Sequence, residues 1–523
     1  MNIQGLNPSS KDTVWDLLVI GGGATGLGVA VQAALEGRRV TLVEARDFAS
    51  GTSSRSTKLL HGGVRYLAQG RWRLVREALR ERATVLGLAP HLAQPLPFVV
   101  PGAGWLSWAW TGLGLKVYQW LSGRLSLGAT QALSQQALGR SLPGLPRMVA
   151  GAVAGMRYWD GQFEDARLAL ALAKTARRAG ARVHNHMRVT TLAPSAQGWQ
   201  VSLFNERDGQ TSTLQARCVV NATGVWVDAL RQMVLQPWAG EVPVKALVKP
   251  SQGVHLVVAR ERLPIEEAVL IPRTADGRVL FAVPWLGATV IGTTDTPRSD
   301  APLEPLPLQE ELDFLFRETR QALGVDLTRA DVRSVWVGLR PLVDSAQGAA
   351  TSQMSREHLT RREAPGLFTV TGGKWTTYRS MAAQVMQALV GHGDLPRAAQ
   401  GPAQTAHHQL VGAPEAGQAV HAISQAPGLH LWGSEAALVL ALPGAKRDLG
   451  MGLTEAMVRF AARSEWALTV EDMLARRWRA LFLDARQAAR MAPAVAAVLH
   501  EETGLDPQLD AFLDLCQRYT LAD

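Results

Sequence analysis

The first ninety residues show an apolar run, a glycine-rich turn, an apolar helix pattern and a second apolar run, in that order. Residues 16–20 (DLLVI) predict a short buried strand, and residues 39–44 (RVTLVE) predict another. Between them, the glycine-rich turn at 21–26 leads into an Ala-rich segment that predicts a helix ending near Glu36. A strand, turn, helix and strand in this order open a parallel, doubly wound sheet.

Later segments supply the rest of two sheets. Apolar residues at helical spacing predict helices over 71–88 and 165–179. Further runs that predict strands of the first sheet lie at 183–191, 199–204, 219–222 and 367–370. Runs that predict a second sheet, mixed or antiparallel, lie at 254–258, 279–283, 289–291 and 334–337. We interpret this second sheet as the substrate-facing layer of an α/β protein.

The last part of the chain has a different pattern. Residues 396–427 are rich in Gly, Pro, Ala and Gln, which predicts a linker. Beyond residue 428 the pattern is helical, with helices expected at 454–462 and 471–488. We therefore expect the two sheets within 1–395 and a separate all-α domain over 428–523.

Residues 102–123 (GAGWLSWAWTGLGLKVYQWLSG) are apolar over nearly the length of a membrane span, with Lys116 as their single charge. Five glycines and four tryptophans spread along the segment argue against a transmembrane helix, because tryptophan prefers the membrane interface. Two interpretations stay open. The segment is either a helix lying on a surface or membrane interface, or a helix buried in the core.

Composition and charge narrow the function classes. Hydrophobic residues make up 47% and charged residues 19%, which is typical of a globular protein with a sizeable core. The formal charge of +9 favours an anionic partner, but without a Lys/Arg block or a binding motif we do not expect nucleic acid. Cys218 and Cys516 form no CxxC pair, and the sequence predicts neither a disulfide nor a metal site. The N-terminus lacks a signal-peptide pattern, which favours the cytoplasm.

The most informative motif is Gly21-x-Gly23-x-x-Gly26, which follows the first strand and opens the first helix. Its glycines permit a tight turn and the close approach of a pyrophosphate, to which the helix N-terminus offers N–H groups. Glu44, 18 residues after Gly26, can accept hydrogen bonds from ribose hydroxyls. The sequence therefore predicts dinucleotide binding, but this spacing alone does not separate FAD from NAD.

Residues 53–66 (SSRSTKLLHGGVRY) form a second, polar motif. Its small hydroxyl residues and glycines can pack closely against a flat ring system. His61, Arg65 and Tyr66 are then candidates to reach the substrate. On general grounds a single histidine of this kind is more often structural than catalytic.

These stretches resemble the FAD-dependent, respiratory glycerol-3-phosphate dehydrogenases of bacteria. The similarity runs in family order over about residues 16–385 through IGGGATGLGVA, SSRSTKLLHGGVRYL, REALRER, APHL, DARLALALA, VVNATGVWVD, GVHLVV, IGTTDT, VGLRPL and TGGKWTTYR. The tail TVEDMLARRWRALFLDA is similar to the C-terminal helical domain of that family. The departures are Trp375, where leucine is usual, and Trp478, where a small polar residue is expected. We expect them to alter packing or the rim of the site without changing the activity.

The resemblance implies a Rossmann-like FAD-binding domain, mainly 14–90, 160–230 and 345–392, interleaved with a substrate domain, mainly 91–159 and 240–344. It implies oxidation of sn-glycerol 3-phosphate to dihydroxyacetone phosphate, with a hydride passing to flavin N5 and electrons to a membrane quinone. It also implies peripheral attachment to the cytoplasmic side of the inner membrane. A homodimer is one candidate assembly, which the sequence does not decide.

The motifs and the resemblance together predict a site for FAD. Its residues are expected to be Gly21, Gly23, Ala24, Thr25, Gly26, Glu44, Thr52, Ser53, Ser54, Lys58, Leu59, His61, Gly62, Gly63, Val189, Ala222, Thr223, Gly224, Gly373, Lys374 and Thr376. Beside the flavin, Tyr66 is expected to position the substrate and Asp295 to orient neighbouring groups.

The predicted catalytic and substrate-binding residues follow from the chemistry of a phosphorylated alcohol. Arg65, Arg340 and Lys374 match family positions at the substrate site, and the planar fork of arginine suits a phosphate dianion. His255 is the candidate base, because a neutral imidazole can accept a proton at cellular pH. His61 is the second candidate base, with orientation of the flavin as its other role.

Three other interpretations stay open. A flavin oxidase of an amino acid or 2-hydroxy acid would need a carboxylate clamp and would release hydrogen peroxide. A binding protein that has lost catalysis would hold a flavin that no substrate reduces, but the retention of Arg65, His255, Arg340 and Lys374 argues against it. An NAD-dependent enzyme would be colourless after purification.

Overall fold

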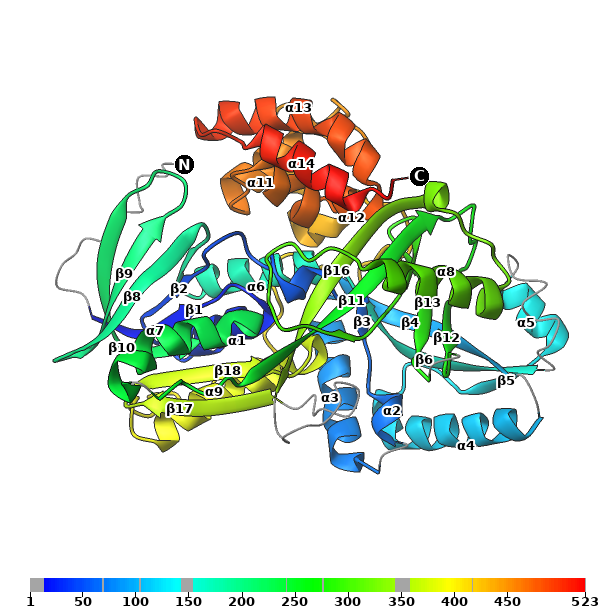
Figure 1. Ribbon diagram of the computed structural model, residues 1–523, viewed down its shortest axis with the longest axis horizontal. Coiled ribbons are helices and arrows are strands. Elements are labelled where there is room, and N and C mark those ends of the chain that lie inside the picture. The colour runs from blue at the N-terminus through cyan, green and yellow to red at the C-terminus, as the bar shows by residue number, and fades with distance from the viewer. Residues whose placement is uncertain are drawn as a thin grey trace.

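Two sheets lie side by side below a group of C-terminal helices (Figure 1). The structure is a computed structural model, and for residues 65, 66 and 105–110 it describes the backbone only. The described residues are 14–67, 70–102, 105–142, 154–240, 242–274, 277–343, 358–415 and 417–522.

The first sheet has the doubly wound, mainly parallel core that the sequence predicts. Its path runs through β1 (Val14–Ile20), β2 (Val40–Val43), β7 (Arg182–His184), β10 (Thr211–Asn221), β17 (His358–Ala364) and β18 (Leu367–Gly372). The strand order is β17-β18-β10-β1-β2-β7, and β1 pairs in parallel with both β10 and β2. Strand β1 is apolar on both faces because both are covered. Leu17 and Val19 face one core, and Leu18 and Ile20 face the other.

Helices and a hairpin cover the two faces of this sheet. They are α1 (Ala24–Leu35), α6 (Asp165–Arg178), α7 (Val227–Ala239), α9 (Tyr378–Gly391), β8 (Met187–Ser195) and β9 (Gly198–Asn205). Helix α1 contacts both α6 and α9, whereas α7 and the β8–β9 hairpin share the opposite core. The predicted single strand 183–191 is wrong, because the chain turns between β7 and β8. His186 has a φ of 53° at this turn, and its Nε2 lies 3.0 Å from Asp472 of the C-terminal part.

The second sheet is mixed, also as predicted. Its strands are β3 (Leu59–Leu60), β4 (Ala93–Gly102), β5 (Gln131–Ser134), β6 (Ala154–Phe163), β11 (Val248–Ala259), β12 (Ala268–Ile271), β13 (Leu280–Trp285), β14 (Ala288–Gly292), β15 (Thr296–Pro297) and β16 (Val332–Val343). Strands β4 and β12 run parallel, and β11 pairs antiparallel with β14 and β16. Helix α8 (Gln309–Leu323) packs against a core that includes β11 and β16.

The tryptophan-rich segment forms a helix, α4 (Trp105–Ser122), beside α3 (Trp72–Leu88). Tyr118 is buried in the core of the second sheet, whereas Leu113 is 57% and Trp120 76% exposed. The helix therefore has one face in the core and an apolar face that points outward. Each of the two interpretations that the sequence leaves open describes one of these faces. In the part of the chain that the structure describes, no helix combines the length and apolarity needed to cross a membrane.

The predicted linker is packed along the rest of the molecule. Its described residues between 392 and 428 form turns and loops. The Val411 N–H donates to Thr175 Oγ1 at 3.0 Å, and the Ile423 N–H donates to the Gln94 side chain at 3.1 Å. These bonds attach the segment to α6 and to the second sheet.

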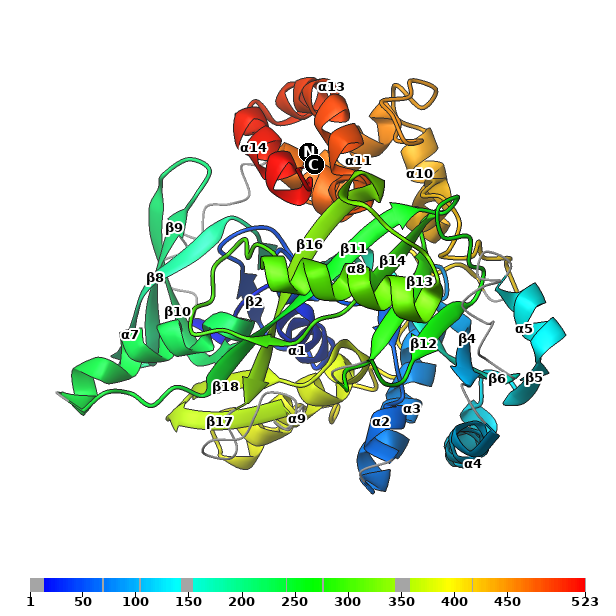
Figure 2. The same ribbon diagram turned by 45° about the vertical axis from the view of Figure 1, so that its right-hand side comes forward.

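The C-terminal helices lie above both sheets (Figure 2). They are α10 (Ala436–Leu440), α11 (Glu455–Ser464), the π-helix η10 (Asp472–Arg477), α12 (Ala480–Leu483), α13 (Ala485–Thr503) and α14 (Leu509–Tyr519). The predicted helix 471–488 is wrong, because it is broken twice. Arg479 has a φ of 68°, and the extended Asp484 caps α13 by accepting the Gln487 N–H at 2.9 Å.

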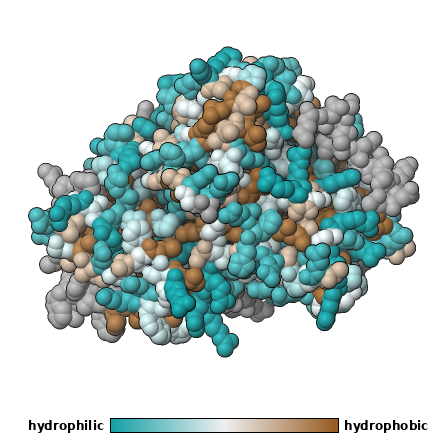
Figure 3. Space-filling model, turned by 180° about the vertical axis from the view of Figure 1, so that it is seen from behind, coloured by the Kyte–Doolittle hydropathy of each residue, from teal (hydrophilic) through white to brown (hydrophobic). Residues whose placement is uncertain are grey.

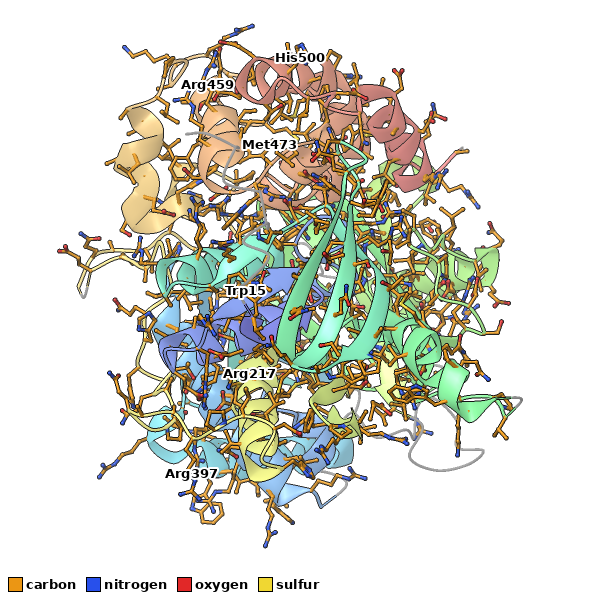
Figure 4. The ribbon with its side chains drawn as sticks, turned by 90° about the vertical axis from the view of Figure 1, so that its left-hand side faces the viewer. Trp15, Arg217, Arg397, Arg459, Met473 and His500 are labelled. Atoms are coloured by element: carbon orange, nitrogen blue, oxygen red, sulfur yellow. The ribbon has the colours of Figure 1, made fainter. Side chains whose placement is uncertain are left out.

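The C-terminal domain has a buried interior and a mixed surface. Met473 is fully buried, and Figure 4 shows it nearer the sheets than Arg459 and His500, which lie toward the far side of the domain. Seen from behind, apolar surface gathers near the top of the view, where this domain lies (Figure 3). Trp478, one of the two departures from the family pattern, is fully buried and stacks on Trp432 with ring centroids 5.9 Å apart.

Buried ion pairs join this domain to the first sheet. Arg477 is fully buried and donates to both carboxylate oxygens of Asp47. Arg167 of α6 pairs with the buried Glu465 at 2.8 Å. Since charges removed from water need close partners, these pairs restrict how the helices can sit on the sheet.

Arg477→Met should destabilise the protein, because it removes a partner from the buried Asp47 carboxylate. Removing one member of a buried pair costs about 3–5 kcal/mol, and Arg476 also contacts Asp47, which favours the lower end. The control is Arg447→Met, because Arg447 is 66% exposed and pairs with Glu455. Exposed pairs contribute about 0–1 kcal/mol. Equal urea midpoints for the two variants would contradict the role given to the buried pair.

Candidate functional site

A cavity of about 1620 Å³ lies between the two sheets and the C-terminal domain. Its wall includes the glycine turn after β1, strands β11 and β16, and residues of the C-terminal domain such as Gln508. Pockets for drug-sized ligands occupy about 300–1,000 Å³. The larger volume here suits a dinucleotide together with a small substrate.

The glycine turn is shaped to receive a pyrophosphate. Gly21 has a φ of 113°, and a Cβ there would lie 2.5 Å from the Ala222 carbonyl oxygen, so a side chain does not fit. Gly26 packs directly against the Gly21 carbonyl, which lets α1 begin at the end of β1. Residues 23–25 line the cavity at the N-terminus of α1, where N–H groups and the helix dipole attract an anion.

Glu44 lies directly after β2 and lines the same cavity. Its carboxylate accepts the Gly22 N–H at 2.6 Å and the Arg46 N–H at 2.9 Å. Burial raises the pKa of this carboxyl, against the lowering effect of the two N–H groups. A carboxylate has about four lone-pair sites, so Glu44 keeps acceptor capacity for ribose hydroxyls. The turn and Glu44 together fit the adenosine diphosphate part of FAD.

His255 lies on β11 and lines the cavity from the second sheet. Its ring stacks on Trp336 of β16 at 4.0 Å between centroids and 17° between planes. Its Nε2 is 3.0 Å from Thr57 Oγ1, while its buried Nδ1 has no hydrogen-bond partner among the described residues. Burial, together with the charges of Lys58 and Arg340, holds the pKa of His255 well below its ordinary value. The imidazole is therefore neutral and can accept a proton.

Arg340 lies on β16, opposite Ser251 of β11. Its guanidinium donates to Thr293 Oγ1 at 3.1 Å and to Asp295 Oδ1 at 3.4 Å. A Cβ at Gly253 would lie 2.5 Å from this guanidinium, so glycine makes room for it. With 23% of its side chain exposed at the cavity wall, Arg340 can reach an anionic ligand.

Most of the remaining predicted cofactor residues lie on the same wall. They come from the polar segment 52–63, from strand β8, from the turn after β10 and from the segment after β18. They are Thr52, Ser53, Leu59, His61, Gly63, Val189, Ala222, Thr223, Gly224, Gly373, Lys374 and Thr376. The sheet topology thus gathers segments that are distant in sequence around one cavity.

Some predicted residues do not line the cavity. Gly26 is buried in the first turn of α1 against the Gly21 carbonyl, and the Gly62 N–H donates to Asp160 at 3.1 Å with the Tyr118 hydroxyl packed against Gly62. Ser54 and Lys58 are buried away from it, and the Lys58 ammonium donates to the Ser54 carbonyl oxygen at 2.7 Å. These four residues thus lie behind the cavity wall, and their expected contact with the cofactor stays a prediction.

Arg65 and Tyr66 belong to α2 (Val64–Leu67), but their side chains lie outside the described part of the chain. Their predicted contacts with the substrate therefore stay predictions.

Sequence reasoning missed part of the wall. Glu471, Arg476 and Gln508 of the C-terminal domain line the cavity, although the tail shows no chemical motif. The resemblance of the tail to a family domain was the available signal, and it pointed to no residue. Trp375 also lines the cavity and donates its Nε1–H to the Ser53 carbonyl oxygen at 2.8 Å. This departure from the family pattern is thus part of the cavity wall.

Two protein families match this chain. Residues 16–386 match the family described as FAD dependent oxidoreductase. Residues 403–509 match the C-terminal domain of alpha-glycerophosphate oxidase.

Curated relatives match over nearly the whole chain. The mitochondrial glycerol-3-phosphate dehydrogenase of Homo sapiens is 37% identical over 529 residues, covering 94% of this chain and 71% of the human protein. The mitochondrial glycerol-3-phosphate dehydrogenase of Arabidopsis thaliana is 38% identical over 531 residues, covering 93% and 82% of the two chains.

Solved structures share the fold. The glycerol-3-phosphate dehydrogenase of Bacillus halodurans, complexed with FAD, has a TM-score of 0.75 and 28% identity, covering 98% of this chain and 96% of that one. Glycine oxidase from Geobacillus kaustophilus, with a TM-score of 0.52 and 21% identity over 72% of this chain and 95% of that one, shows the fold alone. FAD is the cofactor that the glycine turn and Glu44 fit. By these matches, this chain belongs to the family of FAD-dependent glycerol-3-phosphate dehydrogenases.

Proposed function

We propose that this chain oxidises sn-glycerol 3-phosphate to dihydroxyacetone phosphate and passes the electrons to a membrane quinone. The observation that carries the proposal is the pair of His255 and Arg340. They lie on neighbouring strands and line the cavity that also contains the Gly21 turn. FAD, when bound, supplies the acceptor for the hydride that leaves the substrate carbon.

His255 takes the role of the base. A secondary alcohol loses its hydroxyl proton as its carbon is oxidised, and a neutral imidazole can receive that proton. The lowered pKa keeps His255 neutral, and the contacts with Trp336 and Thr57 fix the direction of its ring. The positive charge of Arg340 also favours negative charge that develops on the substrate oxygen.

Arg340 and Lys374 take the role of phosphate ligands. Arg340 reaches the cavity from β16, and Lys374 reaches it from the turn after β18. Thr293 and Asp295 hold the guanidinium of Arg340 by hydrogen bonds, which reduces the conformational freedom lost when the phosphate binds.

The direct test is an anaerobic titration of the purified, FAD-loaded protein. The flavin absorption should bleach with sn-glycerol 3-phosphate, but not with glycerol or lactate. A yellow protein that lactate or an amino acid bleaches, and that glycerol phosphate does not, would favour the oxidase interpretation instead.

Arg340→Ala should raise KM for sn-glycerol 3-phosphate by about tenfold or more, with the FAD content unchanged. Hydrogen bonds to charged groups contribute about 1.5–3 kcal/mol each, and 1.4 kcal/mol corresponds to about tenfold in affinity. The control is Arg298→Ala, because Arg298 pairs with Asp300 and does not line the cavity. An unchanged KM and kcat/KM in Arg340→Ala would remove Arg340 from the phosphate site.

His255→Gln should retain FAD but slow flavin reduction at every pH, since glutamine can bond Thr57 but cannot serve as the base. In the unmodified protein, the rate should stay level as the pH falls through about 6.5, the ordinary histidine value. The pKa of His255 is lowered, so its acceptor form persists until the pH falls to that lowered value. Stopped-flow measurement of flavin reduction checks both statements. Reduction at the unmodified rate in His255→Gln would place the base elsewhere, with His61 next.

We also propose that the outward faces of α3 and α4 attach the protein to the membrane surface. These two helices are in contact, and they expose Trp72, Leu113 and Trp120 together with Arg73 and Arg76. Apolar side chains beside cationic ones suit the interface of an anionic bilayer. Attachment on the cytoplasmic side and a homodimeric state stay sequence-based predictions.

Trp120→Ala should reduce cosedimentation of the protein with vesicles that contain anionic phosphatidylglycerol. Added salt should weaken binding of the unmodified protein, because salt screens exposed charges. Trp238→Ala, at a tryptophan that is 55% exposed on α7, serves as the control and should bind normally. Equal binding by both variants would place the membrane contact elsewhere.

A further inference from the structure

A cluster of four buried charges lies close to His255. It consists of Lys58, Glu164, Asp165 and Arg479, whose side chains are all 0% exposed. Lys58 Nζ lies 2.7 Å from Asp165 Oδ2, and Arg479 pairs with Glu164 at 2.9 Å and with Asp165 at 3.3 Å. When Lys58 is protonated, two cations and two carboxylates balance one another, as charges removed from water require. We call this group the buried charge cluster.

The C-terminal domain completes the buried charge cluster. Arg479 precedes α12, and its guanidinium donates to the carbonyl oxygen of Ser54, 425 positions away, at 2.7 Å. Lys58 donates to the same carbonyl at 2.7 Å. Ser54 therefore joins a cation of the C-terminal domain to a cation of the polar segment that lines the cavity.

Two routes lead from Lys58 to His255. Lys58 Nζ lies 4.5 Å from the centre of the Trp336 ring, and that ring stacks on His255. Thr57, the neighbour of Lys58 in the chain, places its hydroxyl 3.0 Å from His255 Nε2. A shift of Lys58 would therefore disturb both contacts that orient the imidazole.

We propose that Lys58 is a positioning residue for His255 and that the C-terminal domain, through Arg479, holds Lys58 in place. The proposal rests on the proposed function, because it concerns the same base. Lys58 does not line the cavity, so its effect reaches the reaction through Trp336, Thr57 and its own charge.

The positive charge of Lys58 also disfavours protonation of His255, which keeps the imidazole in the neutral form that can accept a proton. The charged groups that act on the imidazole are Lys58 and Arg340, both cationic, while Asp165, Glu164 and Arg479 surround Lys58. Burial lowers the pKa of Lys58 to about 7, against the opposing attraction of Asp165, whereas the pKa of His255 is held well below 6.5. As the pH falls, Lys58 takes up its proton first, and its positive charge then opposes protonation of His255.

Lys58→Met removes this charge while keeping an apolar chain of similar length. The measurement is the pH dependence of anaerobic flavin reduction by sn-glycerol 3-phosphate in the full, FAD-loaded chain. We expect the rate of the variant to begin to fall at a higher pH than that of the unmodified protein, because the charge of Lys58 no longer opposes protonation of His255, while burial and Arg340 still do. FAD content and KM at alkaline pH should not change. A pH profile equal to that of the unmodified protein would overturn the proposal.

A second variant distinguishes a specific effect of Lys58 from an effect of misfolding. Lys58→Met leaves one carboxylate of the buried charge cluster unbalanced, whereas the double variant Lys58→Met/Asp165→Asn removes one charge of each sign. The double variant should show the same shift of the pH profile. The control is Arg231→Met. Arg231 of α7 is also buried, and it pairs with Glu363 of β17 at 2.7 Å. This control should lose stability without a shift, and an equal shift in it would refute a specific role for Lys58.

Arg479→Met tests the part played by the C-terminal domain. We expect slower flavin reduction with KM unchanged, and partial recovery in Arg479→Lys, which restores a cation. An unchanged rate in Arg479→Met would remove the domain from the proposal.

The outcome for His255→Gln separates this proposal from the proposed function. If that variant reduces flavin at the unmodified rate, His255 is not the base, and the positioning role of Lys58 fails together with that assignment, whereas the proposed function fails only if sn-glycerol 3-phosphate does not bleach the flavin. If that variant is slow while Lys58→Met keeps the unmodified pH profile, only the positioning role fails.

Discussion

Pairing of fully buried charges is the constraint on which the arrangement of this protein depends. An unpaired charge in the interior is very costly, so Asp165 at the start of α6 must meet both Lys58 and Arg479. These partners come from the polar segment after β2 and from the C-terminal domain. Their contacts with Asp165 restrict how the C-terminal helices pack on the sheets and which path the segment with Thr57 takes. The same constraint therefore affects the orientation of His255, because Thr57 contacts its ring.

Glycines make the space in which His255 and Arg340 lie, the two side chains with proposed roles in the reaction. A Cβ at Gly292 would lie 2.5 Å from the His255 ring, and one at Gly253 would lie 2.5 Å from the Arg340 guanidinium. At Gly338, a Cβ would meet the backbone of residue 55 at 2.6 Å. The antiparallel register sets Gly253 of β11 opposite Gly338 of β16, and His255 of β11 opposite Gly292 of β14. The site thus follows from strand pairing and from the absence of side chains at a few positions.

Local patterns predict the features that depend on neighbouring residues. The glycine turn and Glu44 could be located from sequence because strand, turn, helix and acid follow one another within about thirty residues. The predicted strand 183–191 and the predicted helix 471–488 were wrong where a residue binds a distant partner. Arg479 breaks the helix while its guanidinium contacts Ser54, 425 positions away, and no periodicity records such a contact. For the same reason the sequence does not reveal the contacts of Lys58 with Asp165 and Trp336.

The most direct test of this account is a crystal structure of the FAD-loaded protein with dihydroxyacetone phosphate. The account predicts that the phosphate lies within hydrogen-bond distance of Arg340 and that the carbonyl oxygen lies beside the His255 ring. A phosphate bound away from Arg340, or a carbonyl group turned away from His255, would contradict it.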